Sequence, residues 1–371
     1  MMQRNPADSK LFQPIQLGHI ALKHRVIMAP MSRLRTTGKH SDIPIPGLVK
    51  EYYSQRASTP GTLIISEGLI VAPEGAGFPG GQGLWSDEQI TEWKEIVDAV
   101  HAKGSFIFAQ LAALGRTVFS KEHLQSYNPK YDVVGAGDIP VTNGEKVRML
   151  SVEEVKKFIG LFVTAASNAV HRAGFDGVEI HGANGHFVNQ FIEDVSNNRT
   201  DEYGGSIENR SRFVLEVVDA VSKAIGEQRT SLRLSPWSRD WDARMEDPIP
   251  TYSYLISQLK SLHPNLAYLH AVEPRVSGIG DQEVLEGESN DFVRRIWLPR
   301  PLISAGGYKR QDALETAQEE GMLIAFGRHF ISNPDLPVRL EKNLPLTKYD
   351  RSKFYVVGDA SGQGYTDYRF A

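Results

Sequence analysis

The sequence predicts an α/β protein whose strands close into a (β/α)8 barrel, the TIM-barrel fold. Three observations predict it: eight short apolar runs recur along the 371 residues, longer amphipathic segments separate most of them, and no linker or low-complexity tract interrupts the pattern. Strands that alternate with helices form parallel βαβ units, and eight such units favour a closed barrel over an open sheet. We therefore expect a single domain over residues 1–371.

The expected strands are rich in β-branched residues and apolar along most of their length, as strands covered on both faces are. They lie at residues 26–29, 62–66, 105–110, 177–181, 230–234, 267–270, 302–305 and 323–326. Amphipathic helices are expected at 91–103, from 151 onward, and at 207–225, 252–262 and 310–320. The second of these opens with Ser151-Val152-Glu153-Glu154, which has the spacing of a capping box.

The connecting segments carry three further expectations. Residues 11–22 read as a small hairpin that turns at Gly18-His19 and closes the bottom of the barrel. The long connections 72–88 and 116–150 are candidate lids or pocket walls. Residues 75–80 spell a dinucleotide-binding fingerprint, but Pro73 and Pro79 flank and interrupt it and no helix opens at its third glycine, so we interpret it as a flexible loop.

Composition excludes several classes of protein. The chain has no cysteine, which excludes a disulfide framework, a thiolate nucleophile, cysteine-bound zinc and a protein-bound iron–sulfur cluster. The formal net charge of −4 argues against a nucleic-acid partner. No run resembles a signal peptide or a membrane span, so we expect a cytoplasmic protein. His181 and His186 lack the spacing of a helical metal pair, and no metal site is expected.

In a barrel of this kind, chemistry belongs at the carboxyl ends of the strands. Polar or backbone-exposing residues stand there in this sequence: Pro30, Ser32, Gly68, Gln110, His181, Asn184, His186, Arg233, Gly306, Gly307, Gly327 and Arg328. The glycines and Arg328 after the last two strands suit a phosphate group. Arg233 inside an apolar strand needs an anionic ligand or a salt bridge to a carboxylate such as Glu67 or Glu179. His181 and Asn184 offer two donors to one carbonyl oxygen, although a buried histidine satisfied by backbone groups is the alternative.

Two long motifs carry a family resemblance. The stretch His181-Gly-Ala-Asn184-Gly-His186-Phe-Val-Asn-Gln-Phe191, and then the stretch from Asn198 to Phe213, strongly resemble the Old Yellow Enzyme family of flavin-dependent ene-reductases. The resemblance continues through residues 28–32, 232–236, 272–275, 327–336 and 348–351, and so covers nearly the whole chain. Its overall character is similar to fungal enzymes of secondary metabolism, such as those of ergot-alkaloid pathways.

The resemblance implies FMN bound noncovalently in the barrel, with NADPH or NADH as the reductant. It assigns ten residues to the cofactor: Pro30, Ser32, Gly68, Gln110, Arg233, Gly306, Gly307, Gly327, Arg328 and Phe354. It implies that His181 and Asn184 bind the carbonyl of an α,β-unsaturated substrate, whose β-carbon receives a hydride and whose α-carbon receives a proton. We expect an enone or enal as substrate and a monomer or homodimer as the assembly.

The chain departs from the family at two positions. The usual proton donor is a tyrosine two residues after the asparagine, and here that residue is His186. Three interpretations stay open: His186 is the acid, solvent or another residue protonates while His186 shapes the pocket, or the enzyme isomerises or desaturates its substrate instead of reducing it. The second departure is Ala112, where the family often has tryptophan, and it predicts a larger or polycyclic substrate.

Two functions from other classes compete with a flavin-dependent reductase. A barrel lyase or aldolase would need a Schiff-base lysine or metal carboxylates at the strand ends, and neither is found there. A non-catalytic barrel that only binds a partner is the remote alternative. Because the chain lacks redox-active thiols, any redox chemistry requires a bound organic cofactor.

Overall fold

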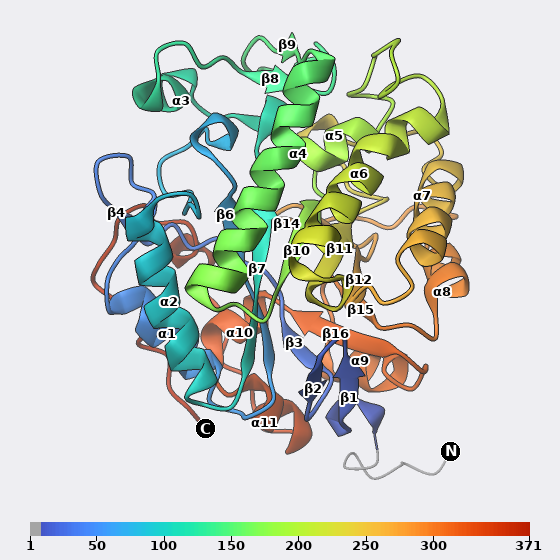
Figure 1. Cartoon of the computed structure of the whole chain (residues 1–371). Helices are drawn as coiled ribbons and strands as arrows, with labels where there is room; N and C mark the ends of the chain where they lie inside the picture. The colour runs from blue at the N-terminus through green and yellow to red at the C-terminus, as the bar shows by residue number, and fades with distance from the viewer. Residues whose placement is uncertain (1–8) are drawn as a thin grey trace.

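The eight predicted runs form the strands of a closed barrel in a computed structural model that describes residues 9–371 (Figure 1). The strands follow one another around the barrel in the order β10-β11-β12-β15-β16-β3-β6-β7, and each neighbouring pair is parallel. Their bounds are β3 Val26–Met28, β6 Leu63–Ile70, β7 Phe106–Ala112, β10 Gly177–Gly182, β11 Thr230–Leu234, β12 Tyr268–Val272, β15 Leu302–Ala305 and β16 Met322–Phe326. The predicted (β/α)8 barrel is confirmed.

Helices surround the barrel. Their bounds are α1 Leu48–Arg56, α2 Asp87–His101, α3 Lys121–Tyr127, α4 Val152–Ser167, α5 Phe187–Ile192, α6 Ile207–Ile225, α7 Ile249–Leu262, α8 Asp291–Trp297, α9 Arg310–Thr316, α10 Arg328–Ser332 and α11 Leu336–Glu341. Helix α6 has its predicted bounds, and the predicted capping box of Ser151 and Glu154 opens α4. Helix α2 begins earlier than expected, because Ser86 and Gln89 form a second capping box. Helix α9 ends earlier, at Thr316.

The N-terminal hairpin closes the lower end of the barrel in Figure 1, as expected. Strand β1 (Ile15–Leu17) pairs with β2 (Ile20–Leu22), and Gly18 turns between them at a φ of 54°. Side chains of the hairpin pack with apolar residues of the barrel interior in one cluster: Leu17, Ile20, Leu22, Ile27, Leu63, Phe108, Ile303 and Leu323. A larger cluster fills the space between the strands and the surrounding helices. Packing therefore fills the lower barrel and leaves the upper end for polar groups.

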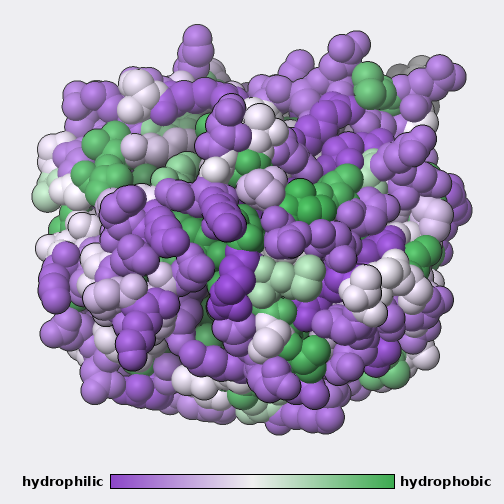
Figure 2. Space-filling view, turned by 90° about the horizontal axis from the view of Figure 1, so that it is seen from above, coloured by the Kyte–Doolittle hydropathy of each residue, from purple (hydrophilic) through white to green (hydrophobic). Residues whose placement is uncertain are grey.

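The long connections lie at the upper end of the barrel in Figure 1, around α3 and the short strands β8 (Val134–Gly135) and β9 (Arg148–Met149). Shorter pairs are β4 (Thr36–Thr37) with β5 (Ile43–Pro44) and β13 (Val276–Ser277) with β14 (Gly280–Asp281). Residues 75–80 follow a single 3-10 turn and no helix opens before α2, so their interpretation as a loop rather than a dinucleotide fingerprint is confirmed. Figure 2 looks onto this end, where hydrophobic patches lie among a mostly hydrophilic surface. Within residues 9–371, no helix has the length and apolar character that crossing a membrane requires.

Candidate functional site at the barrel mouth

Strand register brings the predicted site residues together at the carboxyl ends of the strands. His181 on β10 lies beside Arg233 on β11, and Arg233 lies beside His270 on β12. On the other side of β10, Glu179 lies beside Gln110 of β7, and Gln110 lies beside Gly68 of β6. Because residues two apart on a strand share a face, Glu179 and His181 point the same way. We call this end of the barrel, with His181, Asn184, His186 and Arg233, the barrel mouth.

A buried carboxylate balances charge beneath the mouth. Glu179 accepts hydrogen bonds from Gln110 Nε2 at 2.8 Å and contacts His270 Nδ1 at 2.8 Å. Burial raises the pKa of the Glu179 carboxyl, but His270, Arg233 and Gln110 together outweigh burial and hold that pKa below its usual range. Glu179 therefore carries a negative charge next to the Arg233 cation.

Arg233 has no ion pair within the described part of the chain, residues 9–371, and its Nε atom is buried without a hydrogen-bond partner. The salt-bridge alternative raised by the sequence is thus not what the structure contains: the oxygens of Glu179 bond to Gln110 and His270, and Glu67 accepts from the backbone N–H of Arg33. A buried N–H donor without a partner is costly unless an anionic or acceptor ligand completes it. Its place at the mouth fits the flavin that the family resemblance implies.

The turn after β10 presents Asn184 in a left-handed conformation, with φ at 57°. Its backbone N–H donates to Ser235 Oγ at 2.7 Å, directly after β11. Helix α5 holds the next residue: Gly185 N–H donates to Asn189 Oδ1 at 2.8 Å, and Gln190 Nε2 donates to the Gly185 carbonyl at 2.9 Å. The turn is therefore fixed by these backbone contacts, and the Asn184 side chain makes no hydrogen bond within residues 9–371.

His181 near the end of β10 and His186 in the turn after it are both neutral near pH 7. Burial lowers the pKa of His181 well below its ordinary value, with help from His186 and Arg233. Burial and the Arg233 charge lower the pKa of His186 to about 4. The two rings lie 5.1 Å apart between centroids. His181 Nδ1 and Asn184 Oδ1 are buried without a hydrogen-bond partner, so the alternative of a histidine satisfied by backbone groups is not observed.

The residues assigned to FMN by resemblance surround the same mouth. The Ser32 hydroxyl makes no hydrogen bond within residues 9–371, and Pro30 before it is buried. A Cβ added at Gly68 would lie 3.6 Å from both Ala112 Cβ and Gln110 Oε1, which is ordinary contact, so protein packing alone does not require glycine there. Gly306 and Gly307 have φ of 131° and 63°, which explains glycine at both positions.

Two of these residues have partners that the sequence did not indicate. Arg328, expected at a phosphate, forms a two-pronged ion pair with Asp281 of β14, with Nη1 to Oδ2 at 2.9 Å and Nη2 to Oδ1 at 2.5 Å. Gly327 before it lies against Met31, whose Sδ would be 2.8 Å from an added Cβ. Phe354 is buried, and its carbonyl accepts from Arg33 Nε at 3.1 Å, which ties the C-terminal segment to the end of β3.

The long segment 116–150 lines an open cavity of about 430 Å³ beside the mouth, with Val118, Phe119, Val141 and Trp241 among its walls. Phe119 packs against Trp241 at 4.9 Å and against Phe78 of the segment 72–88 at 5.4 Å, measured between ring centroids. An added Cβ at Gly185 would lie 2.9 Å from Trp241 Cβ, so this aromatic wall adjoins the turn of the mouth. Part of segment 116–150, expected as a lid or pocket wall, thus lines this cavity, and its role at the mouth stays a prediction.

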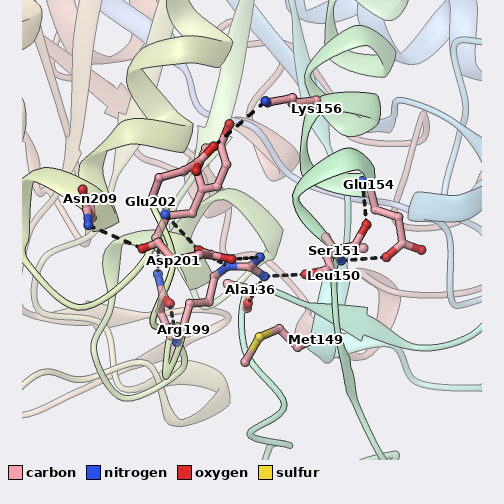
Figure 3. Close-up of polar contacts among 12 residues, drawn as sticks. Ala136, Met149, Leu150, Ser151, Glu154, Lys156, Arg199, Asp201, Glu202 and Asn209 are labelled. Atoms are coloured by element: carbon pink, nitrogen blue, oxygen red, sulfur yellow. Dashed lines mark hydrogen bonds and ion pairs between the residues drawn. The ribbon is translucent and has the colours of Figure 1, made fainter.

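A cluster of Arg199, Asp201, Ala136 and Leu150 holds that wall in place, and we call it the Arg199 clamp (Figure 3). Arg199 is buried and pairs with Asp201 through two contacts of 3.0 and 2.6 Å. Its Nη1 donates to the carbonyls of Ala136 and Leu150 at 2.9 and 2.7 Å. The motif that begins at Asn198 thus joins the segment before α6 to the segment before α4 and has a structural role.

Sequence reasoning missed several residues that shape the site. Glu179 appeared only as a partner for Arg233, although its position two residues before His181 placed it on the inward face. His270 carried the same signal of alternation on its strand. Thr117, whose Oγ1 lies 2.8 Å from His186 Nδ1, ends the short 3-10 helix Gly115–Thr117 and had no sequence signal.

Comparison with known proteins agrees with this geometry. Residues 10–347 match the model of the NADH:flavin oxidoreductase / NADH oxidase family. Among curated relatives, the NADP-dependent oxidoreductase lnbE of Aspergillus flavus is 47% identical, covering 98% of this chain and 97% of its own. The chanoclavine-I aldehyde reductase fgaOx3 of Penicillium roqueforti is 43% identical with the same coverage. A probable inactive reductase, easA of Epichloe festucae var. lolii, is 42% identical over 98% of this chain and 96% of its own.

Solved structures show the same barrel. An Old Yellow Enzyme from a Pichia species superposes with a TM-score of 0.88 at 35% identity, covering 98% of this chain and 94% of its own. Morphinone reductase in complex with tetrahydroNAD superposes with a TM-score of 0.86 at 35% identity, covering 98% of both chains. The chain therefore belongs to the NADH:flavin oxidoreductase / NADH oxidase family of oxidoreductases and, within it, to the Old Yellow Enzymes.

Proposed function

We propose that this protein is an FMN-dependent oxidoreductase that acts on the activated C=C bond of an α,β-unsaturated carbonyl compound, with NADPH or NADH as reductant. The observation that carries the proposal is the group of unpartnered polar atoms at the barrel mouth, on His181, Asn184 and Arg233. His181 Nδ1 and Arg233 Nε can donate to a ligand, and Asn184 Oδ1 can accept from one, at the end of the barrel where the carboxyl ends of the strands meet.

When bound, FMN supplies the hydride transfer that the side chains themselves cannot perform. Arg233 provides a fixed positive charge, and Ser32 and Gln110 provide polar atoms that hydrogen bonds can use. Gly68, which has no side chain, is proposed to leave space for the flat flavin ring, and Pro30 and Phe354 are proposed to lie at its borders. Gly306, Gly307, Gly327 and Arg328 are proposed to hold the phosphate, and for Arg328 this requires sharing or exchange of its Asp281 partner.

His181 and Asn184 are proposed to bind the substrate carbonyl. Donors fixed in advance stabilise the negative charge that the carbonyl oxygen gains as a hydride reaches the β-carbon. Both residues suit this role because the backbone of the turn is held by Ser235 and α5 while their side chains have unused polar atoms. The proton for the α-carbon is a separate question, since His186 replaces the family's tyrosine.

The substrate is proposed to be bulky, in keeping with a secondary metabolite. Ala112 lies at the end of β7, where the family often has tryptophan, and its small side chain leaves more space there than an indole would. The name of the relative fgaOx3, a chanoclavine-I aldehyde reductase, supports an aldehyde among the possible substrates. We expect Ala112→Trp to lower activity on bulky enones and to spare a small one such as cyclohexenone. Equal or better wild-type turnover of cyclohexenone than of bulky enones would contradict this.

The direct test adds FMN to the purified protein and records its visible spectrum. We expect a bound flavin that NADPH bleaches anaerobically and that an enone then reoxidises, with a saturated carbonyl compound as product. A protein that binds no flavin overturns the assignment of cofactor. A bound flavin with an isomerised or more unsaturated product favours the isomerase or desaturase alternative instead. The cytoplasmic location and the monomer or homodimer remain proposals from the sequence.

A further inference from the structure

His186 belongs to a short chain of hydrogen bonds whose geometry determines which nitrogen of its ring carries the proton. Its Nδ1 lies 2.8 Å from Thr117 Oγ1, and Thr117 Oγ1 lies 2.7 Å from the Leu114 carbonyl oxygen. The carbonyl can only accept, and the hydroxyl has a single hydrogen to donate. Both contacts hold a proton only when the hydroxyl donates to Leu114 and His186 Nδ1–H donates to the hydroxyl. With Nδ1 unprotonated, one of the two contacts would bring lone pairs together.

The charges around His186 keep its ring neutral. Arg233 and His181 are the titratable groups that face it, Thr117 is its polar neighbour from the preceding loop, and no carboxylate pairs with it within residues 9–371. Burial and Arg233 lower its pKa to about 4, so the ring carries one proton at neutral pH. That single proton is the one on Nδ1, which Thr117 engages.

The remaining ring nitrogen is open. His186 Nε2 has no hydrogen-bond partner in the described part of the chain, and it is not among the enclosed atoms that lack one. His186 is half-buried and stands beside His181 at the mouth. A neutral ring with its proton on Nδ1 presents only a lone pair at Nε2.

We propose that Thr117 is a positioning residue that holds His186 in its Nδ1–H form, so that Nε2 accepts a hydrogen bond from a hydroxyl or N–H group of the substrate. The part that concerns the substrate rests on the proposed function. His186 then occupies the position of the family's tyrosine but does not act as the proton donor. The hydride still goes to the β-carbon, and the proton that the α-carbon takes up comes from water. The substrate class follows: a bulky enone or enal with a hydrogen-bond donor beside the reacting alkene.

The first experiment needs no flavin and no turnover. Long-range ¹H–¹⁵N NMR distinguishes the two neutral forms of a histidine ring, and the signal among the 11 histidines that His186→Gln removes identifies His186. At pH 7 we expect the Nδ1–H form in the wild type and in Thr117→Ser. In Thr117→Val, which removes the acceptor and keeps the shape, the signal should move towards the Nε2–H form. A wild-type ring with its proton on Nε2, or doubly protonated, would overturn the proposal even if neither Thr117 variant folds.

The second experiment measures kcat/KM of the FMN-loaded enzyme on a bulky enone with a hydroxyl group and on its O-methyl ether. A hydroxyl can donate to Nε2 and an ether cannot, so we expect a preference of about tenfold, one hydrogen bond, for the alcohol. Thr117→Ser should keep the preference and Thr117→Val should abolish it, since an Nε2–H donor serves both oxygens. An unchanged preference in Thr117→Val overturns the substrate role. If the enzyme reduces neither compound, the proposed function is wrong. The NMR experiment then still determines which ring nitrogen of His186 carries the proton.

Discussion

The barrel mouth and the Arg199 clamp each contain an arginine, half-buried at the mouth and buried in the clamp, and the two arginines differ in their hydrogen-bond partners. In the clamp, Arg199 pairs with Asp201 and donates to two carbonyls. At the mouth, Arg233 keeps a buried Nε without any hydrogen bond, and His181 and Asn184 also have unpartnered atoms. Folding normally satisfies buried polar groups, so unpartnered atoms at the carboxyl ends of the strands, where barrels of this kind bind their ligands, support a ligand site there. The comparison thus distinguishes residues that stabilise the fold, such as Arg199, from residues whose polar atoms can bind a ligand, such as Arg233.

The largest effect should come from Asn184→Gly, which removes the amide and tolerates the left-handed backbone that Asn184 adopts. If Asn184 stabilises charge on the substrate carbonyl, its loss should lower kcat on an enone by roughly 10²–10³-fold. Steady-state kinetics with NADPH measure it, and the free energy of unfolding should change by less than about 1 kcal/mol. A loss of activity that merely follows a loss of folded protein would remove Asn184 from the mouth's chemistry.

The next effect should be on stability, in Arg199→Met. The change leaves Asp201 without its cation and the carbonyls of Ala136 and Leu150 without their donor. We expect the free energy of unfolding to fall by about 3 kcal/mol. Urea unfolding measures it. The matched control is Arg212→Met, an exposed arginine of the same motif, which should stay within about 0.5 kcal/mol of the wild type.

A smaller effect should appear in the pH dependence of stability at Glu193, which supports the turn through Asn189. Glu193 accepts from Tyr252 Oη at 2.6 Å and from Asn189 Nδ2 at 3.2 Å, and burial raises its pKa from 4.5 to about 8. The native state therefore keeps a proton that the unfolded chain loses above about pH 4.5, so stability falls as pH rises towards 8.

Glu193→Gln keeps the shape and cannot ionise, so it should remove this part of the slope. We expect the variant to equal the wild type near pH 4.5 and to be more stable by about 2 kcal/mol at pH 6, measured by urea unfolding at each pH. The exposed control Glu341→Gln should leave the slope unchanged. Parallel pH profiles for Glu193→Gln and the wild type would show that Glu193 is ionised in the native state.

Sequence reasoning found the mouth because its residues follow strands, and the ends of parallel strands meet by geometry. His181, Gln110 and Arg233 were placed correctly on that ground alone. Contacts between loops have no such periodic signal, which is why Thr117 with His186, Arg328 with Asp281 and Arg199 with Ala136 could not be predicted. The early start of α2 could have been predicted, because Ser86 and Gln89 have the spacing of a capping box.

The most direct test of this comparison pairs Gly68→Ala with Arg199→Met and measures two quantities for each, the free energy of unfolding without FMN and the Kd for FMN. The added methyl group at residue 68 meets only ordinary contacts in the protein, so stability should hold or rise by roughly 0.4–1 kcal/mol. FMN that needs that space should bind at least about tenfold more weakly. Arg199→Met should lose stability and keep its Kd within about threefold of the wild type, since the clamp lies outside the mouth. Unchanged FMN binding in Gly68→Ala, or an equal loss of stability in both variants, would contradict the assignment of the mouth to the cofactor.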